Sequence, residues 1–196
     1  MTEKITQLKQ QASYRNWNGC IEKTAELFKA LDYRVCIKLL YQYFQQYLPV
    51  FQKNHPEAIW VLEYLDRITQ EIMTPFSVAT RKFLLPENHS EFEAPGSNGF
   101  VIALEDFWDL VFSDQSKADQ YEKCADIMAH IITIKLTYDW GTRNLDEWLH
   151  WYHSHDSEGE NKEIVVLTMM DDPLVAKLET KLWSDLADQI QNLLNN

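Results

Sequence analysis

The residues best suited to chemistry lie in the stretch 145–153, whose apolar spacing predicts a helix. One side of this helix would carry a carboxylate and two imidazoles, which are groups that bind divalent transition metals. Three further potential ligands, His155, Asp156 and Glu158, follow in a polar segment. The sequence therefore contains a candidate metal site, formed by Asp146, Glu147, His150 and His153.

The same residues have a simpler interpretation. Exposed histidines near the carboxyl end of a helix are common, because an imidazolium there gains from the helix dipole. The chain contains no HExxH motif, and the pair Glu147 and His150 is its single Glu-x-x-His spacing, where a di-iron bundle needs two. Both interpretations, a divalent-metal site and a solvated helix end, therefore stay open.

Other catalytic patterns are incomplete. Asp126 and His130 lie one helical turn apart, which is half of a general-base arrangement, but no Gly-x-Ser-x-Gly motif supplies a nucleophile. Such a pair is more typical of a polar contact within a helical core. The segment 96–99 has two glycines but lacks the lysine of a phosphate-binding loop. None of these patterns predicts a reaction.

A second candidate is an acidic surface. Residues 83–119 contain eight acidic residues and one basic residue, Lys117. An acidic strip beside exposed aromatic side chains suits a basic protein partner, because charge speeds the encounter and aromatic rings anchor the complex. The alternative is a solvated helix face. The predicted partner-binding residues are Glu105, Asp106, Phe107, Asp109 and Trp151, and both aromatic residues are expected to be partly exposed.

These candidates would be positioned by helices, because apolar residues recur with helical spacing along almost the whole chain. One stripe, 36–47, is expected to end at Pro49. A long helix around 127–136 has apolar residues on several sides and is expected to be central. The last helix is expected to start at Asp171-Asp172-Pro173. In 145–153, the core-facing stripe would be Leu145, Trp148, Leu149 and Tyr152.

The sequence predicts an all-α fold, a bundle or irregular array of about seven to nine helices. Gly and Pro together number 11 of 196 residues, too few for the frequent turns of an all-β protein. The β-branched segment 163–170 is the exception and is expected to be extended. We expect a single helical domain over 1–196, in which a polar loop near 86–99 either separates two helical halves or lies on the surface.

Charge narrows the classes of partner. The formal net charge is −12, divided into +3 over residues 1–60 and −15 over residues 61–196. An acidic surface repels nucleic acid and anionic membranes, because affinity for both rests on basic residues.

The three widely spaced cysteines predict free, buried thiols in a reducing compartment. Together with a polar amino-terminal segment, they predict a cytoplasmic location.

The expected function is therefore a cytoplasmic, non-catalytic interaction module, adaptor or immunity-like, whose acidic face binds a basic protein. The adaptor or immunity-like role is suggested by likeness to a broad class of small acidic helical proteins. The sequence resembles no single family closely enough to assign roles to specific residues. The alternative is a metal-dependent enzyme that uses the cluster near residues 146–156. No other cofactor is indicated, and the apolar stripes also allow a homodimer.

Overall fold

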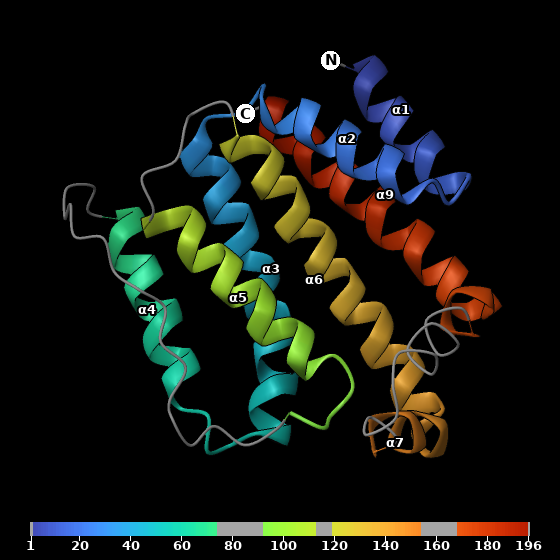
Figure 1. Ribbon diagram of the computed structural model, residues 1–196. Helices are drawn as coiled ribbons and strands as arrows, with labels where there is room; N and C mark the ends of the chain where they lie inside the picture. The colour runs from blue at the N-terminus through green and yellow to red at the C-terminus, as the bar shows by residue number, and fades with distance from the viewer. Residues whose placement is uncertain (1, 74–91, 113–118, 154–167, 196) are drawn as a thin grey trace.

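The computed structural model describes residues 2–73, 92–112, 119–153 and 168–195, and it shows an array of helices (Figure 1). All regular secondary structure within these ranges is helical, which confirms the predicted all-α class. The helices are α1 (Thr2–Ser13), α2 (Trp17–Phe28), α3 (Tyr33–Asn54), α4 (Trp60–Met73), α5 (Ser97–Phe112), α6 (Gln120–Arg143), α7 (Leu145–His153) and α9 (Pro173–Asn195).

Helix α6 lies between two groups of helices (Figure 1). On one side α1, α2 and α9 pack on one another, and on the other side α3, α4 and α5 do the same. Helix α6 contacts α2, α3, α5, α7 and α9, so its buried residues point in several directions, from Cys124 through Ile131 to Trp140. This arrangement confirms the central helix expected from the apolar residues around 127–136.

Buried apolar side chains from every helix named above join in one hydrophobic core. Helix α3 precedes the predicted loop near 86–99 and contacts both α5 and α6, which follow that loop. Residues 86–91 lie outside the described residues. Residues 92–96 are not helical, and the last three residues of the predicted loop already form the first turn of α5.

Two predicted helix boundaries have different outcomes. The start of α9 is confirmed, because the Asp172 carboxylate accepts hydrogen bonds from the backbone N–H groups of Leu174, at 2.7 Å, and Val175, at 3.4 Å. The expected end at Pro49 is wrong, because α3 continues through it to Asn54. Phe51 is fully buried beyond the proline, and burial of such a side chain offsets much of the cost of a proline inside a helix.

The extended segment expected near 163–170 is wrong for the part that the structure describes. Residues 168–170 are helical, whereas 163–167 lie outside the described residues. Met169 is buried in the core, and the N–H of Asp172 donates to its carbonyl oxygen at 3.2 Å. Packing of this turn against the core therefore outweighs local β propensity, which depends strongly on context.

Candidate functional site

Helix α5 presents a polar edge to solvent. Its exposed side chains recur at helical spacing and include the three predicted acidic residues, with an isoleucine that is 54% exposed among them. The opposite faces of α5 are covered by α3, α4 and α6. The exposed edge consists of Asn98, Ile102, Glu105, Asp106 and Asp109.

The expectation that Phe107 is partly exposed is wrong. Phe107 is fully buried, and its ring stacks on that of Phe44 in α3, with centroids 5.1 Å apart. It belongs to a stripe of buried residues, since Phe100, Ala103 and Leu110 are also buried at the corresponding helical positions. That spacing is present in the sequence and is the signal that could have placed Phe107 in the core. It cannot contact a partner.

The acidic edge of α5 borders a depression between α2, α5 and α6, with a volume of about 420 Å³. Three carboxylates line it, together with one lysine and one histidine. Trp17 and Ile21 of α2 form an apolar wall. We call this hollow the acidic depression, and its charged or titratable lining residues are Asp106, Asp109, Lys123, Asp126 and His130.

His130 links the two helices that flank this depression. Its Nδ1 lies 3.1 Å from Oδ2 of Asp106 on α5, so its hydrogen-bond partner is Asp106 and not the neighbouring Asp126 expected from α6. Both Asp126 and His130 are exposed, so the polar contact within a helical core that the sequence favoured is wrong. Partial burial raises the pKa of the Asp126 carboxyl; the nearby His130 opposes this rise, and the carboxylates of Glu122 and Asp106 add to it. The carboxylates of Glu122, Asp106 and Asp126 thus lie close enough to repel one another, and a bound cation would relieve this repulsion.

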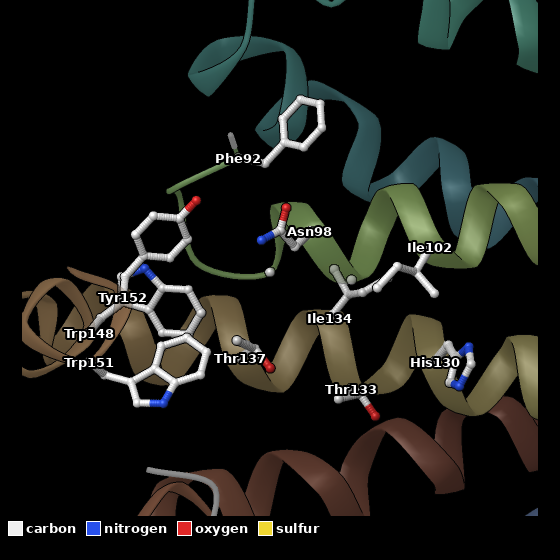
Figure 2. A pocket seen from close by; sticks show the side chains of 12 residues that line it. Phe92, Asn98, Ile102, His130, Thr133, Ile134, Thr137, Trp148, Trp151 and Tyr152 are labelled. Atoms are coloured by element: carbon white, nitrogen blue, oxygen red, sulfur yellow. The ribbon is translucent and has the colours of Figure 1, made fainter. Parts of the chain in front are cut away.

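A second hollow lies at the other end of the exposed side of α6, and no pattern in the sequence predicted it. It has a volume of about 560 Å³ and is lined mainly by apolar groups. Figure 2 shows the rings of Trp148, Trp151 and Tyr152 from α7 gathered at one end, with Thr137 and Thr133 following along α6. We call this hollow the aromatic pocket; Ile102 and Asn98 of α5 also line it.

The wall of the aromatic pocket is fixed by close contacts around the turn at 93–96. The Trp148 indole N–H donates to the Glu93 carbonyl oxygen at 2.7 Å, and the Tyr47 hydroxyl donates to the Pro95 carbonyl oxygen at 2.9 Å. Gly96 has a φ of 80°, and a Cβ there would lie 2.8 Å from the carbonyl oxygen of Ile134. A glycine therefore lets the turn approach α6 closely.

Helix α7 is less buried than its predicted core stripe implied. Trp148 is buried, but Leu145 is 49% exposed, and Tyr152 is half-buried at the pocket. Trp151, a predicted partner-binding residue, is half-buried and stands 4.8 Å from Trp148 between ring centroids. Helix α7 is partly exposed because it packs at the end of α6 (Figure 1). Only part of the surface of α7 therefore covers the core.

The predicted metal ligands Asp146, Glu147, His150 and His153 are all exposed on α7. Within residues 2–73, 92–112, 119–153 and 168–195, no group of three or more His, Cys, Asp or Glu side chains is arranged to hold a metal ion. The further ligands expected from His155, Asp156 and Glu158 lie outside these ranges. The metal site therefore stays a prediction.

The cysteines are poor candidates for nucleophiles. All three are buried and free, as the sequence predicted. Burial raises the pKa of both Cys20 and Cys36 to about 12, and it raises the pKa of Cys124 as well. A thiolate is the reactive form, and burial in apolar surroundings suppresses it. On the exposed side of α6, carboxylates at one end and aromatic rings at the other can bind a ligand.

Compared with known proteins, the chain matches no family model, no curated protein and no solved structure. The hydropathy of the described helices shows none that combines the length and apolar character needed to span a membrane.

Proposed function

We propose that this protein is a non-catalytic, cytoplasmic interaction module that binds a basic protein partner through the exposed edge of α5 and the adjoining side of α6. The observation that carries the proposal is the acidic depression, in which Asp106, Asp109 and Asp126 converge from two helices. Carboxylates held together on a solvent-facing surface raise the negative potential locally and attract cationic partners.

Two further features support a protein partner. The depression has an apolar wall, Trp17 and Ile21, on which the aliphatic stem of a bound lysine or arginine can pack. The exposed Ile102 lies on the same edge of α5 as the carboxylates, and binding would remove it from water. The acidic net charge would speed the encounter at low ionic strength.

Capture from a lysate of the source cells tests the proposal. The immobilised protein is expected to retain a basic protein in near-stoichiometric amount and to release it as salt rises. A variant with Glu105→Lys, Asp106→Lys and Asp109→Lys should lose this retention. For the identified partner, its association rate at low salt should fall about tenfold or more, with a flatter salt dependence.

A matched control carries the same charge change elsewhere. Glu63→Lys, Asp66→Lys and Glu71→Lys alter α4 and leave the acidic depression intact. This control should retain the partner as the parent does. Equal retention by the α5 variant and the parent would overturn the proposal, as would the absence of any protein released specifically by salt.

A further inference from the structure

The acidic depression and the aromatic pocket share part of their lining. His130 and Thr133 on the exposed side of α6 belong to both hollows. Figure 2 shows His130, Thr133 and Thr137 following one another along this helix, with Ile102 of α5 across from them. The two hollows are therefore adjacent sections of one groove along α6.

The spacing of the two sections follows from helix geometry. The α6 residues that line the acidic depression run from Lys123 to Thr133 and are centred between Asp126 and His130. Those that line the aromatic pocket run from His130 to Thr137 and are centred between Thr133 and Ile134. At the rise of an α-helix, these centres are about 8 Å apart along α6. An extended peptide covers that distance in about two to three residues.

The two sections have different chemical preferences. The acidic depression offers carboxylates to a cation, whereas the aromatic pocket offers ring faces from α7 and the exposed side chain of Ile102. The pocket also holds polar groups, the Asn98 amide and the Thr137 hydroxyl, which can bind a peptide backbone. A ligand that uses both sections must therefore be cationic at one point and apolar at another.

On the basis of the proposed function, we infer that the groove binds an extended segment of the basic partner that carries a lysine or arginine and, about two to three residues away, a large apolar side chain. The basic residue occupies the acidic depression, and the apolar residue enters the aromatic pocket. The charge complementarity of the first section and the aromatic lining of the second together select this occupant.

Selection from a library of random short peptides displayed on phage tests the inference and does not require the partner itself. Peptides enriched on the parent protein should share a Lys or Arg and a Trp, Phe, Leu or Ile at the stated spacing. Parallel selection on the Asp106→Lys, Asp109→Lys variant should not enrich them. Enrichment of peptides that lack the fixed spacing would overturn the inference.

Double-mutant cycles with one selected peptide then assign each end to its section. Replacing the apolar residue of the peptide by Ala should weaken binding to the parent about 30-fold, and much less to Trp151→Ala. Ile102→Ser changes an exposed site and should leave folding intact. It should weaken the binding of the unchanged selected peptide about fivefold. Ile59→Ser, at an isoleucine that is 62% exposed outside the groove, should have no effect.

A second double-mutant cycle tests the Lys or Arg of the selected peptide. The peptide with its Lys or Arg replaced by Ala should bind the parent and the Asp106→Asn, Asp109→Asn variant equally. The loss of coupling at either end would overturn the assignment of that end.

Failure of the inference and failure of the proposed function give different results. Enriched peptides that are basic, salt-sensitive and indifferent to Trp151→Ala and Ile102→Ser would overturn the two-section groove and leave the acidic docking face intact. Enriched peptides that are apolar and indifferent to the charge reversal would contradict both. A selection that enriches nothing overturns the inference, and lysate capture then tests the proposed function separately.

Discussion

Acidic and aromatic residues meet in two regions of this molecule, with opposite consequences. Where α1, α2 and α9 pack together, Glu179 is fully buried and accepts a hydrogen bond from Arg15 Nε at 3.1 Å, and the ring of Trp183 is fully buried as well. On the side formed by α5, α6 and α7, the carboxylates are exposed and the rings border open hollows. The same residue types therefore form a closed contact in the first region and an accessible surface in the second.

The two regions differ in how far neighbouring helices cover their charged side chains. The Arg15 guanidinium ties the turn between α1 and α2 to α9, since it also donates to the Met170 carbonyl oxygen at 2.6 Å. A buried charge depends on its partner, because removing one member leaves the other without solvent or compensation. An exposed charge keeps its water, so it contributes little to stability and is available to a ligand. Changes in the first region should affect folding, and changes in the second should affect binding.

The largest expected effect is at the ion pair between the partly exposed Arg15 and the fully buried Glu179. Arg15→Met should lower the free energy of unfolding by about 3 kcal/mol, because it leaves the Glu179 carboxylate uncompensated. Adding Glu179→Met should restore much of the loss. The control Lys181→Met breaks an exposed pair with Asp185 and should cost less than about 1 kcal/mol. Urea titrations measure all three, and equal losses for Arg15→Met and Lys181→Met would contradict the contrast.

A second, smaller loss is expected at the turn beneath the aromatic pocket. Gly96→Ala should cost about 2 kcal/mol, because φ is positive there and the new methyl group would meet the Ile134 carbonyl oxygen and the Tyr47 hydroxyl. Gly99→Ala is the matched control, since its nearest neighbour is the side chain of Ile134. The two glycine variants are compared by thermal unfolding. Equal losses of stability in the two variants would show that the turn at 93–96 does not pack closely against α6.

A third test uses pH. Burial beside Phe51 and Phe92 lowers the pKa of His55, and the nearby Glu57 opposes this only in part. Because the unfolded chain then binds a proton more readily than the folded one, stability should fall as pH drops below about 6.5, the ordinary histidine pKa. His55→Phe should reduce this slope between neutral and mildly acidic pH. Chemical denaturation at several pH values measures the slope of stability against pH. If His55→Phe leaves this slope unchanged, groups other than His55 control it.

The smallest effect on stability is expected on the α5 edge. Asp106→Asn with Asp109→Asn should change the free energy of unfolding by less than about 0.5 kcal/mol, because both side chains are exposed. The same pair of changes should slow the association of a basic partner. A large stability loss here would mean that these carboxylates support the fold, and the contrast between the two regions would fail.

The sequence by itself determined the helical class, the central position of α6 and the start of α9. These features depend on local periodicity and on capping chemistry, both of which are written in neighbouring residues. It also indicated the acidic residues of α5, because helical spacing separates a polar edge from an apolar face. It did not show how much of each helix would be covered, so it misplaced Phe107 at the surface and Leu145 in the core.

Only the tertiary structure decided the rest. The ion pair of Arg15 with Glu179 and the contact of Asp106 with His130 join residues that are distant along the chain. The two hollows exist because α2, α5 and α7 border α6 and leave part of its exposed side uncovered. Periodicity tells which residues share a face of one helix. Whether that face is covered, charged or open depends on the helices that pack beside it.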